Sequence, residues 1–162
     1  MKKIFVFVVV VLICAGCGDD KQASQPPQPT KNSQEYVAAG ISYLNQQDVA
    51  KAIHNFDMAI KTDPANVENY MILGQVYMRL KQYERAIDTF SAAVKVAPNN
   101  PEAYYMLSLN NMLDGRYENA EKEAKRSGEL FMLNREEDKF KRSVALLKTI
   151  EEAKNQNGNT LK

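Results

Sequence analysis

Residues 67–100, VENYMILGQVYMRLKQYERAIDTFSAAVKVAPNN, decide the fold, because the neighbouring stretches of the chain repeat their pattern. Residues 33–66 read SQEYVAAGISYLNQQDVAKAIHNFDMAIKTDPAN, and both stretches are 34 residues long. Aligned at this step, the positions that share a residue type are Asn32, Asn66, Asn100 and Asn134; Tyr36, Tyr70 and Tyr104; Tyr43 and Tyr77; Ala52, Ala86 and Ala120; Phe56 and Phe90; Ala59 and Ala93; and Pro64 and Pro98. A fixed period of this length indicates an array of stacked repeats.

The period and these residues resemble the tetratricopeptide repeat family. The resemblance covers two well-formed units, 33–66 and 67–100, and a degenerate unit, 101–134. It implies an all-α fold, a solenoid of about three helical hairpins in which Gly40 and Gly74 mark the closest approach of paired helices. In the third unit the family's Gly, Tyr, Phe, Ala and Pro are replaced by Ser108, Asn111, Ala124, Ser127 and Met132. We therefore expect less regular packing there and a longer second helix.

The ends of the helices carry their own signals. Each repeated Asn precedes an apolar-periodic run, where its side chain can cap free backbone N–H groups, so Asn134 is expected to start a last helix. Beyond it, one apolar stripe is formed by Phe140, Val144, Leu147 and Ile150. The stripe predicts a capping helix over residues 135–155, which a repeat array needs to cover its last unit. Residues 156–162 are expected to be a frayed tail.

The N-terminal residues predict a lipoprotein signal peptide over residues 1–16. Lys2 and Lys3 precede an unbroken apolar run, Ile4–Ile13, of ten residues. That run is shorter than the roughly 20 residues that a spanning helix needs. The following residues resemble a bacterial lipobox, with Cys14 standing where an aliphatic residue is usual. The resemblance implies that Cys17 carries covalent diacylglycerol and an N-acyl lipid, and no other cofactor is expected.

Residues 17–32 are predicted to form a disordered tether rich in Pro and Gln behind the lipidated Cys17. Between Gly18 and Lys31 there are three prolines and no large apolar residue. Such a segment cannot bury enough surface to offset the entropy of ordering. By resemblance to lipoprotein sorting, Gly18 directly after Cys17 favours the periplasmic face of the outer membrane. We expect a lipid-anchored protein of the cell envelope.

Charge and motifs argue against nucleic-acid binding and against catalysis. The chain has 21 Lys and Arg against 20 Asp and Glu, without the concentrated basic footprint of a nucleic-acid binder. Its one histidine, His54, lies on an expected second helix with no nearby Cys or carboxylate at ligand spacing. The sequence has no phosphate-binding glycine loop, paired metal-ligand motif or nucleophile elbow. We expect no metal site and no enzyme.

The family resemblance implies that the first helix of each unit lines a concave groove. The groove positions of this chain are unusually apolar, namely Val37, Ile41, Met71, Gln75, Met78, Tyr105, Leu109 and Met112. Flexible Met and amphipathic Tyr suit a helix or an extended peptide of a protein partner. For each of these residues the alternative is burial in the core. The clamp that some relatives use for C-terminal carboxylates is absent, because its places hold Val37, Ile41, Ile72, Glu102 and Met106.

These observations favour a membrane-anchored interaction scaffold or assembly adaptor of the bacterial cell envelope. Its partner would be an envelope protein or peptide bound in the concave groove. Two alternatives stay open on the sequence: a periplasmic holdase-type chaperone that uses the same apolar surface, and a self-associating structural module that forms a homodimer.

Overall fold

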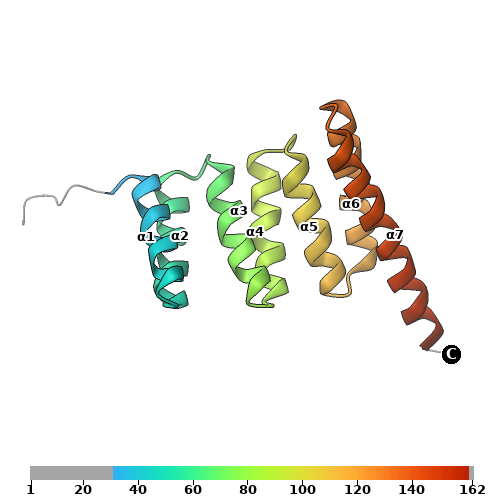
Figure 1. Cartoon of the computed structure of the whole chain (residues 1–162), viewed down its shortest axis with the longest axis horizontal. Coiled ribbons are helices and arrows are strands. Elements are labelled where there is room, and N and C mark those ends of the chain that lie inside the picture. The colour runs from blue at the N-terminus through green and yellow to red at the C-terminus, as the bar shows by residue number, and fades with distance from the viewer. Residues whose placement is uncertain (1–30, 161–162) are drawn as a thin grey trace, which may run out of the picture. The chain divides into compact units, whose positions relative to one another are not determined.

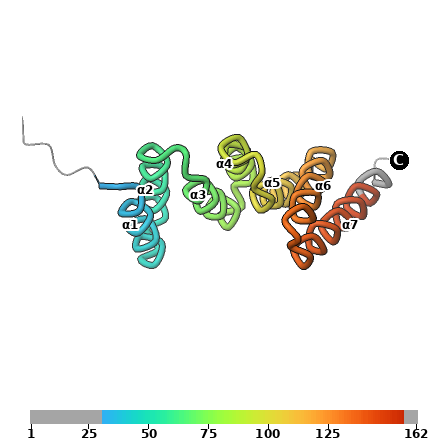
Figure 2. Tube along the Cα trace, turned by 90° about the horizontal axis from the view of Figure 1, so that it is seen from above, coloured from blue at the N-terminus to red at the C-terminus, as the bar shows by residue number. Residues whose placement is uncertain are grey.

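The computed structural model describes residues 31–160, with side chains up to Gln156. Within this range there are seven helices and no strand. The helices are α1 (Ser33–Asn45), α2 (Val49–Thr62), α3 (Val67–Arg79), α4 (Tyr83–Val96), α5 (Pro101–Leu113), α6 (Tyr117–Leu133) and α7 (Glu137–Thr160). Each packs beside the helix before it and the helix after it (Figures 1 and 2). The expected all-α solenoid is confirmed.

The signal peptide over 1–16, the lipidation site Cys17 and the tether up to residue 30 lie outside the described residues. Of the expected tether, only Lys31 and Asn32 are described. Within the described part of the chain, no helix is both long and apolar enough to cross a membrane.

Asparagine side chains begin the first helix of each unit, as the repeated pattern predicts. The side-chain oxygen of Asn32 accepts from the backbone N–H of Glu35 at 2.9 Å, and that of Asn100 accepts from Ala103 at 3.0 Å. Asn66 does the same for Glu68 at 3.1 Å. These bonds satisfy backbone donors that the first turn of a helix leaves free.

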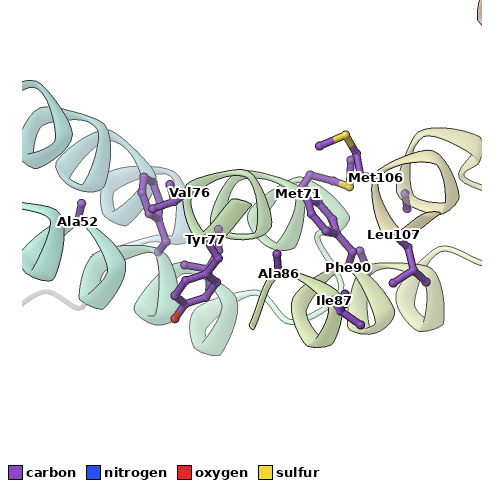
Figure 3. Packing of buried hydrophobic residues seen from close by; sticks show 13 residues of the cluster. Ala52, Met71, Val76, Tyr77, Ala86, Ile87, Phe90, Met106 and Leu107 are labelled. Atoms are coloured by element: carbon purple, nitrogen blue, oxygen red, sulfur yellow. The ribbon is translucent and has the colours of Figure 1, made fainter. Parts of the chain in front are cut away.

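The two helices of each unit meet where a glycine faces a phenylalanine ring. A Cβ atom added to Gly40 would lie 2.6 Å from the ring of Phe56, and one added to Gly74 would lie 2.6 Å from the ring of Phe90. Both rings are fully buried. Figure 3 shows Phe90 among the other apolar side chains of this core, which continues from α2 to α5. Only glycine leaves room for the ring at this position.

The third unit, formed by α5 and α6, packs closely by a different arrangement. Ser108 stands in place of the glycine and is fully buried, and its hydroxyl donates to the carbonyl of Ala120 at 2.7 Å. Ala124, also fully buried, stands in place of the phenylalanine. Ser127 donates to the carbonyl of Pro101 at 2.9 Å and lies 3.1 Å from the hydroxyl of Ser143 on α7. Buried hydroxyls with partners therefore join α5, α6 and α7.

The turn between α6 and α7 differs from the sequence expectation. Asn134 is the C-cap of α6 and does not start the last helix. The backbone of Arg135 is left-handed, with φ 60°, as it is for Gln47 and Lys81 in the turns inside the first two units. Met132 stands where the first two units have a proline. Because no proline stops the helix at this position, α6 continues through it. As expected, α6 is longer than α2 and α4, with 17 residues against 14.

The last helix is also longer than the expected 135–155, because α7 runs from Glu137 to Thr160. Residues 156–160 of the expected frayed tail are thus helical. An ion pair supports this end: Nζ of Lys154 lies 3.1 Å from a carboxylate oxygen of Glu118 on α6. The hydrogen bond from Lys154 lowers the pKa of Glu118, and the same bond raises the pKa of Lys154.

The contact between Gly40 and Phe56 predicts the outcome of a substitution. We expect Gly40→Ala to lower the free energy of unfolding by about 1–3 kcal/mol, because the new methyl group overlaps the ring of a fully buried side chain. Urea unfolding followed by circular dichroism measures this change. Gly128→Ala on α6 is the matched control.

The nearest atom to a Cβ at Gly128 would be 3.6 Å away, which is ordinary contact. Without a clash, the better helix propensity of alanine should raise stability by about 0.5–1 kcal/mol. Equal effects of the two substitutions would show that the ring contact is not what requires glycine at position 40.

Candidate protein-binding face

The eight expected groove residues lie on α1, α3 and α5, and we call the surface that they would form the first-helix face. The structure divides them into three groups. One is buried in the core, four belong to the part around α1 and α3, and three are packed against a cluster of α6 and α7 residues. The members are, in that order, Met71; Val37, Ile41, Gln75 and Met78; and Tyr105, Leu109 and Met112.

Met71 does not contribute to a binding surface. It is 5 % exposed and belongs to the core cluster that also holds Met106 and Phe90. Figure 3 shows the Met71 and Met106 side chains next to each other between α3 and α5. The expectation that Met71 lines a groove is therefore wrong, because the next unit packs over it.

The part of the first-helix face on α1 and α3 stays open. Ile41 is 47 % exposed, and Gln75 is also exposed. Val37 and Met78 are half-buried and rest against the core cluster with one side. Leu44 and Ile72 are half-buried apolar neighbours on the same two helices, which the sequence reading left out of the face. The sequence shows the positions of Leu44 and Ile72 in the helical period. Their partial exposure, however, depends on how α3 packs.

The part on α5 is partly covered by α6 and α7. Tyr105, Leu109 and Met112 are half-buried against a cluster formed by Ala120 and Ala124 of α6 and by Leu146 and Ile150 of α7. Leu146 is 6 % exposed and Ile150 is 1 % exposed. These two helices therefore leave only part of each of the three α5 side chains accessible to a ligand.

Arg142 of α7 contacts two side chains of α5. Its guanidinium lies over the ring of Tyr105, 4.6 Å from the centroid, and 3.6 Å from a carboxylate oxygen of Glu102. A cation over an aromatic face is attracted by the negative face of the ring. Glu102 and Met106 are two of the five carboxylate-clamp places. The carboxylate of Glu102 is paired with Arg142, and Met106 is 8 % exposed.

Perturbed acid–base groups lie apart from the first-helix face and have structural causes. Burial raises the pKa of the Tyr77 phenol, and the nearby negative charge of Asp57 raises it further. Burial likewise raises the pKa of Glu123 on α6. His54 is exposed, and the described residues contain no group of three or more His, Cys, Asp or Glu side chains that could hold a metal ion.

Comparison with known families gives a match over more than half of the chain. A family model described as tetratricopeptide repeat matches residues 37–101 and residues 77–128. No curated protein matches the sequence of this chain.

Solved structures share the fold at low sequence identity. The yeast Sti1 TPR2B domain in complex with pHsp70 has 17 % identity and a TM-score of 0.67, over 74 % of this chain and 96 % of that one. PcrH, a Pseudomonas aeruginosa protein, in complex with the chaperone binding region of PopD has 19 % identity and a TM-score of 0.66, over 75 % and 92 %. The first TPR domain of human RPAP3 has 23 % identity and a TM-score of 0.65, over 78 % and 95 %.

The cover of α7 over α5 leads to a stability prediction. Leu146→Ala removes a buried side chain from the contact between α7 and the first-helix face, so the free energy of unfolding should fall by about 2–4 kcal/mol. Urea unfolding measures the loss. Thr149→Ala on the same helix is the control, since Thr149 is exposed, and it should change stability by less than about 0.5 kcal/mol. A loss as small for Leu146 as for Thr149 would mean that α7 does not hold this part of the face closed.

Proposed function

Because this chain belongs to the tetratricopeptide repeat family, we propose that it is an interaction scaffold or assembly adaptor of the bacterial cell envelope. The part of the first-helix face on α1 and α3 binds a segment of another envelope protein. The observation that carries this proposal is the open apolar surface around Ile41, which is 47 % exposed between half-buried Val37 and Leu44. A contiguous apolar patch at the surface, such as the one that Ile41 forms with its half-buried neighbours, is typical of an interaction site.

The chemistry of the face specifies the kind of ligand. Its exposed centre holds Ile41 and the uncharged Gln75, while Val37 and Ile72 stand at clamp places where a carboxylate ligand would need cations. An amphipathic helix or an extended segment with apolar side chains fits this surface better than an acidic C-terminus. Gln75 supplies a side-chain amide that can donate to and accept from a peptide backbone.

The anchoring part of the proposal rests on sequence. The apolar run Ile4–Ile13 and the small residues before Cys17 support cleavage and lipidation at Cys17, with residues 17–32 linking the lipid to α1. Gly18 after the modified cysteine supports the periplasmic face of the outer membrane as the location. Two acyl chains or more would make the attachment stable.

Lipidation is tested by labelling. When the full chain with its leader is expressed in a bacterial envelope with a radioactive fatty acid, we expect label on the wild-type protein and none on Cys17→Ser. Cys14→Ser is the matched control and should retain the label. Label that persists on Cys17→Ser would overturn the anchor without touching the binding face.

Partner binding is tested by cross-linking in the same membranes. We expect discrete cross-linked partners for the wild type, and Ile41→Asp should lower their yield at least about tenfold, since a carboxylate would be buried against the apolar ligand. Ala50→Asp, at an exposed position of α2, is the control and should leave the yield unchanged.

Equal capture by the two variants would exclude the first-helix face as the binding site. Capture of many unfolded proteins, with suppression of their aggregation, would favour the holdase role over a scaffold.

A further inference from the structure

Exposed apolar side chains gather at the C-terminal end of the array. Among the described residues, six large hydrophobic side chains are exposed, and three of them lie here: Met132 at 60 %, Leu133 at 75 % and Val144 at 47 %. Together with half-buried Phe140 and Leu147 they line a hollow of about 490 Å³ between α6 and α7. We call this surface the α6–α7 groove.

The groove exists because α6 and α7 form a hairpin like those inside the units, but have no phenylalanine at the position of Phe56. The backbone N–H of Glu136 donates to the carbonyl of Phe131 at 2.9 Å, as Asp48 does to Tyr43 in the first unit at 2.9 Å. In this register Gly128 and Val144 stand where the first unit has Gly40 and Phe56.

The ring of Phe56 covers Gly40, but only Ser143 and Phe140 approach a Cβ position at Gly128, at 3.6 and 3.8 Å. Val144 is smaller than phenylalanine and half of it stays exposed. The hairpin therefore keeps an apolar hollow that the ring fills elsewhere.

The same register shows what kind of element would cover the groove. Met132 corresponds to Leu44 of the first hairpin, and Leu44 is half-buried against the core cluster to which α3 contributes. Met132 is 60 % exposed, because no helix follows α7 in the described part of the chain. The face of a terminal unit is normally polar. The α6–α7 groove is instead an apolar packing surface for a further helix.

We propose that this helix is α7 of a second copy of the chain, so that two copies pair symmetrically through their α6–α7 grooves. An apolar groove needs an apolar partner, and within residues 31–156 the groove itself gathers three of the six exposed large hydrophobic side chains. The other exposed hydrophobic residues are separated along the array: Ile41 lies on α1, Leu80 directly follows α3, and Leu113 ends α5. The remaining exposed residues of α1 are polar or small, which disfavours head-to-tail packing of α1 onto α7.

The charges at the rim fit this pairing. Within α6, Lys125 pairs with Glu121 at 2.6 Å, and Arg126 pairs with Glu129 at 3.1 Å. The rim is thus neutralised within each copy, and it presents no excess of one sign that would repel an identical surface or select a strongly charged ligand. A symmetric contact of this kind uses the same patch on both copies and closes at the dimer.

The test is disulfide trapping of the full chain, expressed with its leader in a bacterial envelope. Val144 lies in the groove, so Val144→Cys should yield a covalent dimer under mild oxidation, with position 144 of one copy joined to position 144 of the other. Mass spectrometry of the linked peptides identifies the partner. The wild type and Asp88→Cys, at an exposed position of α4, are the controls and should give no disulfide-linked dimer.

Adding Leu133→Glu to Val144→Cys should lower the dimer yield at least about tenfold, because a carboxylate would enter the apolar contact. Leu133 is 75 % exposed, so the variant should fold and keep the helical circular dichroism spectrum of the wild type. Equal trapping of Val144→Cys and Asp88→Cys, no dimer from Val144→Cys, or no effect of Leu133→Glu would each overturn the proposal. Trapping of a different protein at position 144 would overturn it in favour of a separate partner.

Discussion

The close approach of glycine and phenylalanine inside each hairpin is the contact on which the rest of the array depends. Gly40 and Gly74 let the rings of Phe56 and Phe90 reach the backbone of the facing helix, where a Cβ would lie only 2.6 Å from the ring. The rings are then fully buried, and they join each hairpin to the continuous core of α2 to α5. A hairpin of two short helices cannot bury its apolar surface alone, so it becomes stable through this core and through its neighbours.

Where this contact is changed, the array changes its surface. In the third unit Ser108 and Ala124 replace the pair, and hydroxyl groups with partners compensate for the lost ring. In the hairpin of α6 and α7, Val144 replaces the ring opposite Gly128, and the vacated volume becomes the apolar groove. The position that a buried ring fills in the first two units is thus left open in the last hairpin, which explains its exposed apolar residues.

The last helix, α7, contacts the first-helix face on one side and borders the α6–α7 groove on the other. Together with Ala120 and Ala124 of α6, Leu146 and Ile150 of α7 cover part of Tyr105, Leu109 and Met112 on the first-helix face. The part on α1 and α3 remains open for a ligand, whereas the other side of α7 borders the α6–α7 groove. The proposed binding of an envelope partner and the proposed pairing of two copies therefore use different residues, and one does not obstruct the other.

The sequence by itself determined the helical repeat, the starts of α1, α3 and α5, and the greater length of α6, because these follow from a period of 34 residues and from local capping and proline positions. The tertiary structure alone decided that Met71 is core, that α6 and α7 partly cover three of the eight residues of the expected face, and that Asn134 ends α6. Whether an apolar residue of a helix is buried or exposed depends on which later helix reaches it, and that contact joins residues far apart in the chain. Met71 and Leu109 have the same helical periodicity whether a later helix buries them or leaves them exposed. No local sequence pattern could therefore predict how far each side chain is buried.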